Sequence, residues 1–346
     1  MEFTPKRRYL KVIGIVCMIV VILVIGAVLL SYYLHNHFEQ PYGYEDFQKV
    51  DDHPLYVMHY QGEYGFDEFL KTGSREGTGT TTRISGNGDW GCSVFAVLNP
   101  SGDPRFGRNF DWNDDPALLL FTDPPDAFAS VSMVDIAYLG FDKGAPNEQD
   151  RQRLQEAPYL PFDGMNEVGV AVGMMAVPHA EGGRDPQKVT IGSLHAIRLV
   201  LDYAKNVDQA IALLQGYNID FEEGPPIHYL IADSIGNSVV VEYLDDRLVV
   251  TRNDQPWQVA TNFILSGLTP EMCRSSCWRY QKVYETLSQA GGKLSQAESM
   301  NLLQAVSQEN TIWSVVYDLT TGEIQVVMDR KFDQPLVYHL DMKSAD

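Results

Sequence analysis

The longest apolar run of the chain lies close to its N-terminus. Residues 12–30 (VIGIVCMIVVILVIGAVLL) contain neither a charged residue nor a proline. As a helix rising about 1.5 Å per residue, this run would be about 28 Å long, close to the roughly 30 Å thickness of a bilayer's hydrocarbon core. Lysines and arginines precede the run, and acidic residues follow it. The pattern predicts one transmembrane anchor at 12–34, with residues 1–11 in the cytoplasm and the rest of the chain outside the cell.

A cleaved signal peptide is the alternative interpretation of this run. Such peptides have a shorter apolar core and end at a small-x-small cleavage site. The segment that follows the run, SYYLHNHFEQ (31–40), contains no such site. An uncleaved single-pass anchor is therefore favoured, and it would place the protein in the cell membrane with its large downstream part extracytoplasmic.

Farther along the chain, apolar runs of strand length alternate with segments of helical periodicity. The strand-like runs are SVFAVLN (93–99), RFGRNF (105–110), ALLLF (117–121), VGVAVGMMAV (168–177), HYLIAD (228–233), SVVVEYL (238–244), RLVVTR (247–252), WSVVYDL (313–319) and EIQVVMD (323–329). The helical segments are LHAIRLVLDYAK (194–205), VDQAIALLQ (207–215), SSCWRYQKVYETLSQ (275–289) and SQAESMNLLQAVS (295–307). Two blocks of helices between blocks of strands indicate an α+β fold in which helices cover antiparallel sheets.

The region between the apolar run and the first of these strands has two different parts. Residues 41–71 are rich in tyrosine and phenylalanine, so we expect them to pack on the main body. Residues 72–89 (TGSREGTGTTTRISGNGD) are polar and glycine-rich, which is typical of an exposed loop. We therefore interpret 35–91 as an extracytoplasmic pro-segment and linker, and 92–346 as the main domain.

Composition and charge exclude several functions. Of 346 residues, 45% are hydrophobic, which is enough apolar material for a large core. The formal net charge of -20, with no run of lysine and arginine after the first dozen residues, argues against nucleic acid as a partner. The chain has no HExxH motif, no Cys/His cluster and no EF-hand loop, so we expect neither a metal nor another cofactor.

Four cysteines are too few for a disulfide-built scaffold. Cys17 lies inside the apolar run and is expected to be a small lipid-facing or buried residue. Cys273 and Cys277 would form either a local disulfide or two reduced thiols on one helix. Cys92 follows the polar linker directly and opens the first strand, so it is the candidate nucleophile. A lone cysteine is, however, more often a small buried hydrophobic residue.

Two charged residues accompany Cys92 on the next predicted strand. A hairpin would bring the guanidinium of Arg108 and the carboxylate of Asp111 back towards the cysteine. The thiolate is the reactive form of cysteine, a free thiol has a pKa of about 8.5, and a nearby guanidinium lowers that pKa. A carboxylate beside it would hold or orient an amine. An ordinary cross-strand ion pair is the structural alternative.

The segment Cys-Ser-x-Phe followed by Gly-Arg-Asn-Phe-Asp-Trp resembles the choloylglycine hydrolase family of linear-amide hydrolases. This group includes bile salt hydrolase and penicillin V acylase, with acid ceramidase and N-acylethanolamine amidase as more distant relatives. The resemblance extends from about residue 91 to the C-terminus, because further motifs follow in the family's order. These motifs are Asp163-Gly-Met-Asn-Glu-x-Gly169, Ala260-Thr-Asn262, Ser275-Ser-x-x-Arg279-Tyr and Trp313-Ser-x-x-Tyr317.

The resemblance implies a four-layer αββα sandwich of the N-terminal-nucleophile type and assigns a role to five residues. Cys92 would be the nucleophile and its own α-amine the general base. Arg108 and Asp111 would support that pair. Asn262 would donate a hydrogen bond to the oxyanion, and Arg279 would complete the polar site. Without the resemblance, Asn262 would be interpreted as a turn residue and Arg279 as a solvated residue in the middle of a helix.

One position departs from the family's pattern. Bile salt hydrolases carry a second oxyanion-site asparagine in an Ala-Gly-Leu-Asn-Phe segment, whereas this chain has Ala176 at that place. Either a backbone N–H replaces the missing amide or the substrate differs, and bile salts are therefore not the favoured substrate.

A free α-amine at Cys92 requires cleavage of the bond between Gly91 and Cys92. An α-amine has a pKa of about 7.7–8.0 and can accept the thiol proton, whereas a peptide nitrogen cannot. We expect Cys92 to attack the Gly91 carbonyl and water to release the upstream piece. A papain-like pairing of Cys92 with His179, His195 or His228 is disfavoured, because no papain-type sequence surrounds the cysteine.

The predicted activity is hydrolysis of a linear C–N amide bond through an acyl-enzyme, without a cofactor. The expected partners are a small-molecule N-acyl amide, for which tethering beside lipid favours a fatty acyl chain, and the lipid bilayer through the anchor. Homo-oligomerisation is left open. The alternatives are penicillin V, acyl-homoserine lactone or bile salt hydrolysis, and an inactive membrane-anchored ligand-binding relative.

Overall fold

The computed structural model describes residues 26, 47–73, 91–112, 116–141, 152–221 and 224–344. The predicted cytoplasmic segment 1–11 and, apart from Gly26, the predicted anchor at 12–34 lie outside these ranges. Within them, no helix has both the length and the apolar character that a membrane span needs. The described residues from 47 onward belong to one compact unit.

The larger main sheet of the described residues has nine strands in the order β1-β2-β5-β6-β7-β8-β11-β12-β13. Adjacent strands are antiparallel, except that β2 and β5 run parallel. Its central strands are buried on both faces, which explains why they appear in the sequence as continuous apolar runs. The strands are β1 (Gln48–Asp51), β2 (Leu55–Gln61), β5 (Ala117–Asp123), β6 (Ser130–Asp135), β7 (Asp163–Asn166), β8 (Val170–Ala176), β11 (Ile227–Asp233), β12 (Ser238–Leu244) and β13 (Arg247–Arg252).

The second main sheet of the described residues has six antiparallel strands in the order β14-β3-β4-β15-β16-β17. A small parallel pair, β9 with β10, lies outside both sheets. The bounds of these strands are β3 (Gly91–Val97), β4 (Arg105–Asp111), β9 (Thr190–Gly192), β10 (Asn218–Asp220), β14 (Trp257–Ala260), β15 (Thr311–Asp318), β16 (Glu323–Met328) and β17 (Leu336–His339).

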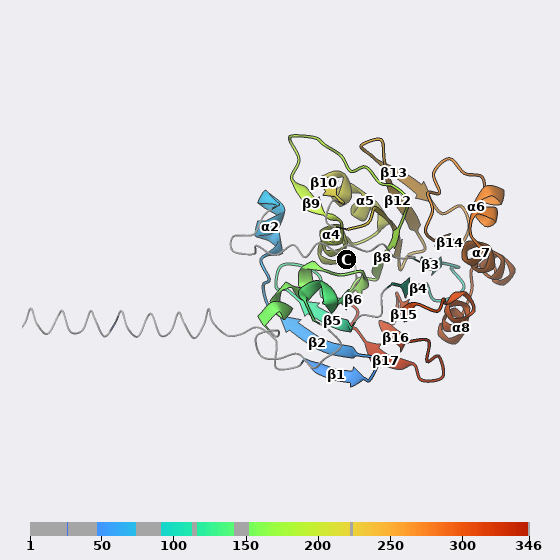
Figure 1. Ribbon diagram of the computed structural model, residues 1–346, viewed down its shortest axis with the longest axis horizontal. Coiled ribbons are helices and arrows are strands. Elements are labelled where there is room, and N and C mark those ends of the chain that lie inside the picture. Colours follow the sequence, from blue (N-terminus) through green and yellow to red (C-terminus); the bar gives the residue numbers. More distant parts are fainter. Residues whose placement is uncertain are drawn as a thin grey trace, which may run out of the picture. The chain divides into compact units, whose positions relative to one another are not determined.

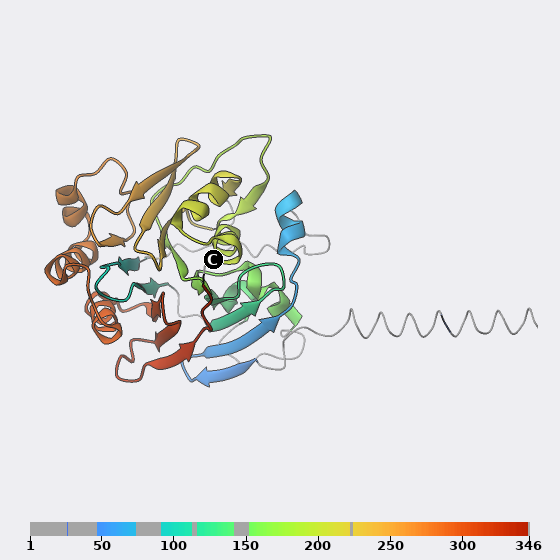
Figure 2. The same cartoon turned by 180° about the vertical axis from the view of Figure 1, so that it is seen from behind.

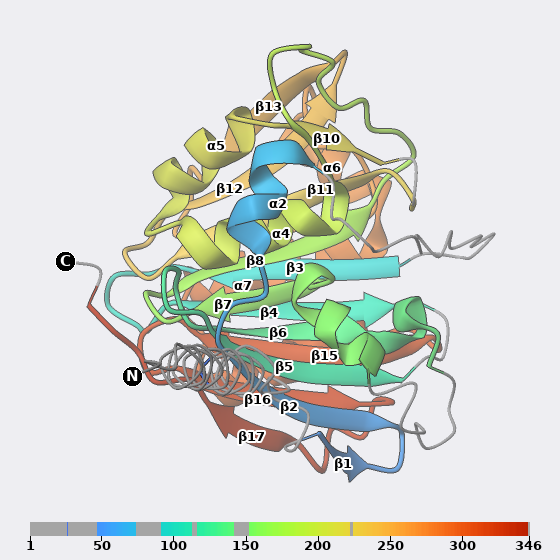
Figure 3. The same ribbon diagram turned by 90° about the vertical axis from the view of Figure 1, so that its left-hand side faces the viewer.

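The two main sheets pack face to face and are covered by helices on their outer faces (Figure 1). Strand β3 contacts β8 across the interface, and β14 contacts β12. Helices α4 and α5 cover the nine-stranded sheet, while α7 and α8 cover the six-stranded one; Figure 2 shows the same layers from behind. The strands of both sheets run in roughly the same direction (Figure 3), as in aligned sheet packing. The helices are α2 (Phe66–Thr72), α4 (Ser193–Tyr203), α5 (Val207–Gln215), α6 (Pro270–Ser276), α7 (Trp278–Ala290) and α8 (Gln296–Val306), with 3₁₀ turns η2 (Ile136–Leu139) and η3 (Leu154–Tyr159).

The α+β class and the four αββα layers expected from the sequence are therefore confirmed. The helix predicted at 275–289 is wrong in one respect, because α6 and α7 are separate helices. Cys277 ends one and begins the other with an extended backbone (φ −151°, ψ 125°). The break places Arg279 in the first turn of α7, although its neighbours in the sequence favour a continuous helix.

The aromatic segment upstream of Cys92 is built into the nine-stranded sheet. Strand β2 lies between β1 and β5, and its residues from Leu55 to Gln61 pair in register with β5. Residues 47–73 thus contribute two strands and α2 to the same body as the residues after 91. The bond proposed for cleavage therefore lies between two segments of the chain that belong to the same folded body.

A buried polar network fastens this upstream segment to α4. The hydroxyl of Tyr64 donates to Asp202 Oδ2 at 2.6 Å, and Arg198 Nη1 donates to Asp202 Oδ1 at 3.1 Å. Tyr159 adds a hydrogen bond from its hydroxyl to the Tyr64 carbonyl at 2.6 Å. Burial raises the pKa of Asp202 to about 6, against the lowering effects of Arg198 and the Tyr64 hydroxyl.

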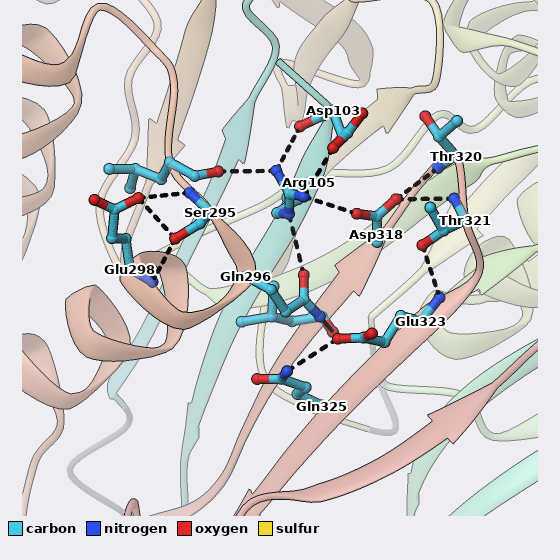
Figure 4. Close-up of polar contacts among 12 residues, drawn as sticks. Asp103, Arg105, Ser295, Gln296, Glu298, Asp318, Thr320, Thr321, Glu323 and Gln325 are labelled. Atoms are coloured by element: carbon cyan, nitrogen blue, oxygen red, sulfur yellow. Dashed lines mark hydrogen bonds and ion pairs between the residues drawn. The ribbon is translucent and has the colours of Figure 1, made fainter.

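A second polar cluster joins the end of β4 that is far from Cys92 to its neighbours (Figure 4). Arg105 Nη2 forms an ion pair with Asp318 Oδ2 of β15 at 3.0 Å, and Arg105 Nε donates to Gln296 Oε1 of α8 at 3.2 Å. Asp318 also accepts backbone N–H bonds from Thr320 and Thr321, which fixes the turn before β16. The ion pair between Arg105 and Asp318 links β4 to β15 at this end, where the two strands pair in register from Trp313 to Asp318.

We expect Tyr64→Phe to lower the free energy of unfolding by about 1–3 kcal/mol, because the buried Asp202 Oδ2 loses its hydroxyl donor. Tyr56→Phe is the matched control, since Tyr56 lies in the same upstream segment and its ring stacks on Phe47. Urea denaturation of both variants measures the difference. Equal midpoints for the two variants would contradict a stabilising Tyr64–Asp202 hydrogen bond.

Candidate functional site

Cys92 is the second residue of β3, as the sequence predicts, and its side chain is fully buried. The β3–β4 hairpin pairs Cys92 with Phe110 and Gly91 with Asp111. Because side chains alternate along a strand, Arg108 shares the face of Cys92, and Asp111 lies on the opposite face. The two predicted partners therefore act from two sides of the same strand.

The guanidinium of Arg108 lies next to the sulfur between the two sheets. Its Nη2 is 3.9 Å from Cys92 Sγ, and its Nη1 donates to the Phe162 carbonyl and to Asp163 Oδ2, both at 2.5 Å. The guanidinium also lies over the Phe110 ring, 4.8 Å from its centroid. These contacts leave the cation fully buried in one orientation facing the thiol.

Asp163 holds Arg108 and is itself held by two aromatic donors. Trp313 Nε1 donates to Asp163 Oδ2 at 3.1 Å, and the Tyr317 hydroxyl donates to Oδ1 at 2.6 Å. Asp163 begins strand β7 and is fully buried. Three of the sequence motifs thus meet at one buried ion pair, which the spacing along the chain does not reveal.

The charge state of the thiol follows from these surroundings. Burial raises the pKa of Cys92, and the carboxylate of Asp111 raises it further. The Arg108 cation and a backbone hydrogen bond from Asp111 lower it. Because burial is the largest of these effects, the sulfur in the uncut chain is held as a neutral thiol, and a base must accept its proton before it can attack.

The carboxylate of Asp111 is enclosed by donors on the side of the helix layer. Thr311 Oγ1 donates to Oδ1 at 2.6 Å, Gln308 Nε2 donates to Oδ2 at 2.7 Å, and Arg279 Nη1 lies 3.9 Å from Oδ2. Burial raises the pKa of Asp111, and these three neighbours oppose that rise. Neither Gln308 nor Thr311 was predicted from the sequence, where only their nearness to the Trp313 motif could have drawn attention to them.

Arg279 lies beneath the backbone of Cys92. Its Nη1 donates to the Cys92 carbonyl and to Ser93 Oγ, the latter at 3.1 Å, and its Nη2 donates to Asn262 Oδ1 at 3.0 Å. The side chain is buried in the first turn of α7, so the alternative of a solvated residue in mid-helix is wrong. The planar guanidinium fork of Arg279 therefore links the backbone of Cys92 to the side chain of Asn262.

Asn262 follows β14 and faces the nitrogen of Cys92. That nitrogen donates to Asn262 Oδ1 at 2.6 Å, and Asn262 Nδ2 donates to the Ala176 carbonyl at 2.8 Å. The side-chain oxygen of Asn262 thus accepts a hydrogen bond from the Cys92 nitrogen, and one of its two amide hydrogens is bonded to the Ala176 carbonyl. The second amide hydrogen is the one that the predicted oxyanion role would use.

His228 supports the loop that carries Asn262. Its ring nitrogens contact Glu242 Oε1 at 3.2 Å and the Thr261 carbonyl at 2.8 Å. Glu242 also accepts the backbone N–H groups of Leu265 and Ser266. Both ring nitrogens are thus engaged away from the sulfur, so His228 does not make a papain-like pair with Cys92.

The remaining cysteines of the described residues, Cys273 and Cys277, are free thiols. The other four predicted site residues therefore converge on Cys92: Arg108 lies at its sulfur, and Asp111, Asn262 and Arg279 lie around its backbone. Such an arrangement can activate a thiol and hold the nitrogen of the same residue.

The family model of acyl-coenzyme A:6-aminopenicillanic acid acyl-transferase matches residues 161–333. This span includes Asp163, Asn262 and Arg279, and begins after the β3–β4 hairpin.

Among curated proteins, an uncharacterized protein of Paramecium bursaria Chlorella virus 1 is 32% identical over 109 residues, which is 29% of this chain and 39% of that protein. The penicillin V acylase of Pectobacterium atrosepticum is 24% identical over 184 residues, which is 49% of each chain. The chain thus spans about half or less of the length of these relatives.

Solved structures support the fold. A conjugated bile acid hydrolase from Clostridium perfringens superposes with a TM-score of 0.54 at 15% identity, over 74% of this chain and 94% of that one. Penicillin V acylase from Agrobacterium tumefaciens superposes with a TM-score of 0.50 at 17% identity, over 72% and 86% of the two chains. The fold is that of the N-terminal-nucleophile hydrolases, and the resemblance inferred from the motifs is confirmed. Since the family model covers half of the sequence, the protein belongs to the acyl-coenzyme A:6-aminopenicillanic acid acyl-transferase family.

Proposed function

We propose that the protein is a cysteine N-terminal-nucleophile hydrolase that cleaves linear C–N amide bonds through an acyl-enzyme. The observation that carries this proposal is that polar groups converge on both reactive atoms of Cys92. Arg108 faces the sulfur, and Asn262 holds the nitrogen at 2.6 Å. The enzyme would be activated by self-cleavage between Gly91 and Cys92.

In the activation step, the Cys92 sulfur attacks the Gly91 carbonyl carbon. The S–C bond forms, the C–N bond breaks, and the nitrogen takes the thiol proton, which gives a thioester and a free amine. Water then hydrolyses the thioester to a Gly91 carboxylate and restores the thiol. Arg279 and Asn262 keep the cysteine backbone in place throughout, since their bonds are to its carbonyl and nitrogen.

In the catalytic cycle, the free α-amine of Cys92 accepts the thiol proton, and the sulfur attacks the carbonyl of the substrate amide. The substrate nitrogen takes that proton and leaves as the amine. Water, deprotonated by the same α-amine, then releases the acid. Arg108 lowers the pKa of the thiol, which makes this proton transfer easier.

We propose N-acyl amides with fatty acyl chains as the substrate class, because the predicted anchor at 12–34 would hold the site beside a lipid bilayer. The catalytic domain would be extracytoplasmic. The pro-segment boundary at 91/92 is then the cleavage point, and residues 92–346 are the chain that carries the nucleophile.

A second candidate reaction is transfer of the acyl group to an amine instead of water. It is favoured by the family model that matches residues 161–333, which is named for such a transfer. Penicillin V hydrolysis is the corresponding candidate from the Pectobacterium relative.

The test is release of free amine from a panel of N-acyl ethanolamines, N-acyl amino acids, bile-salt conjugates and penicillin V, with and without an added acceptor amine. Intact mass of the same preparation reports cleavage at Gly91–Cys92. No turnover of any member by fully cut protein would overturn the amidase proposal. An uncut chain with full activity would overturn the activation scheme.

Cys92→Ala is expected to abolish both self-cleavage and amine release, because no other group at the site can form the acyl intermediate. Cys92→Ser should retain a fraction of each. Cys273→Ala is the matched control, since it removes another buried free thiol. Turnover by Cys92→Ala above background would contradict the assignment of the nucleophile.

The fragments 1–91 and 92–346 are expected to remain together after cleavage. Strand β2 is an inner strand of the nine-stranded sheet, and Tyr64 is tied to Asp202 by a buried hydrogen bond. Size-exclusion chromatography in mild detergent should give one peak with both fragments, which separate only in denaturant. Elution of an active 92–346 fragment alone would contradict this expectation.

Arg279→Lys is expected to reduce kcat/KM by roughly 10²-fold, because an ammonium cannot bridge the Cys92 carbonyl and Asn262 as the planar fork does. Arg274→Lys is the control, since Arg274 lies on the preceding helix in an ion pair with the exposed Glu271. Amine release and thermal unfolding are measured for both. Equal kcat/KM values would show that the Arg279 fork does not contribute to turnover.

A further inference from the structure

Gln308 occupies the loop between α8 and β15 and contacts the carboxylate of Asp111 directly. Its Nε2 donates to Asp111 Oδ2 at 2.7 Å. Its main-chain N–H donates to Thr311 Oγ1 at 2.8 Å, and that hydroxyl in turn donates to Asp111 Oδ1 at 2.6 Å. The loop therefore holds both oxygens of the carboxylate, one by the side chain of Gln308 and one by a hydroxyl that its backbone orients.

The same amide lies against the residue whose carbonyl would be attacked. A Cβ atom added to Gly91 would overlap Gln308 Nε2 and would stand 2.9 Å from Asp111 Oδ2. A side chain at 91 would therefore have to displace the end of the Gln308 side chain. Gly91 pairs with Asp111 on one side of β4, and Thr311 pairs with Asp111 on the other.

We propose that Gln308 is a positioning residue for self-cleavage, which fixes the Asp111 carboxylate against Gly91 at the bond to be cut. This inference rests on the activation step proposed above. Gln308 acts through Asp111: its amide orients the carboxylate and favours the ionised form of that group. No sequence motif includes Gln308, and its role follows only from the contacts of its side chain.

The pH dependence of cleavage reports this role. Burial raises the pKa of Asp111, and the hydrogen bond from Gln308 lowers it. Removing the bond raises the pKa of Asp111 further, so the carboxylate is lost at a higher pH than in the unaltered protein. Among the described residues, the other charged or titratable groups that act electrostatically on Asp111 are Arg279 on α7, Arg108 on its own strand and the Cys92 thiol on β3, and all three remain.

The experiment measures the rate of Gly91–Cys92 cleavage against pH in freshly refolded full-length chain. Gln308→Ala should slow cleavage roughly tenfold near neutral pH and move its acid limb to higher pH, because a hydrogen bond to a charged group is lost. Gln308→Met keeps the length of the side chain without an amide donor or a charge and should show the same shift. Gln304→Ala, at an exposed position of α8, should match the unaltered protein.

A second pair of variants covers the case in which Gln308→Ala folds poorly. Gly91→Ala should displace the Gln308 amide and slow cleavage. The double variant Gly91→Ala/Gln308→Ser should be no slower than the less active of the two single variants Gly91→Ala and Gln308→Ser. An unshifted acid limb in Gln308→Met, or additive losses in the double variant, would overturn the role of Gln308 and leave the activation step standing. Absence of any cleavage in the unaltered protein would instead overturn the activation step itself.

Discussion

The pairing register of β3 with β4 is the constraint on which the site depends. It places Cys92 opposite Phe110 and Gly91 opposite Asp111. Since neighbouring residues on a strand point to opposite faces, the sulfur enters the space between the sheets while Asp111 faces the helix layer. A shift by one residue would exchange these faces, bury the carboxylate between the sheets and remove the thiol from Arg108. The network around Arg105 at the far end of β4 helps to exclude such a shift.

The second requirement of the site is that each buried charge has a partner of opposite sign, because burying an unpaired ion costs free energy. Arg108 is paired with Asp163 on the sulfur side, and Arg279 lies near Asp111 on the backbone side. Each cation therefore contributes to the surroundings of Cys92 without leaving an unbalanced charge in the core. The aromatic donors Trp313 and Tyr317 complete the shell of Asp163, and Gln308 and Thr311 complete that of Asp111.

The fold of the segment upstream of Cys92 determines what the proposed cleavage would change in the protein. Residues 47–73 supply an inner strand of the larger sheet, so cutting the chain at 91 would create a new terminus without removing a domain. A chain anchored through its N-terminus would then keep its catalytic part by strand pairing and by the buried Tyr64–Asp202 bond.

The α+β class, about half of the strands and the two helix blocks were predictable from the sequence by itself. Strands buried on both faces appear as short continuous apolar runs, and helices with one buried face show a period of 3.6 residues. The hairpin expected after Cys92 placed Arg108 and Asp111 near it, and the family resemblance added Asn262 and Arg279 to the same site. The pairing of β3 with β4 then showed that Arg108 and Asp111 lie on opposite faces of their strand. Only the tertiary structure decided that Asp163 neutralises Arg108, that α6 and α7 are separate helices, and that Gln308 meets Gly91. These contacts join residues far apart in the chain, and their geometry is set by sheet packing, which no local pattern of residues encodes.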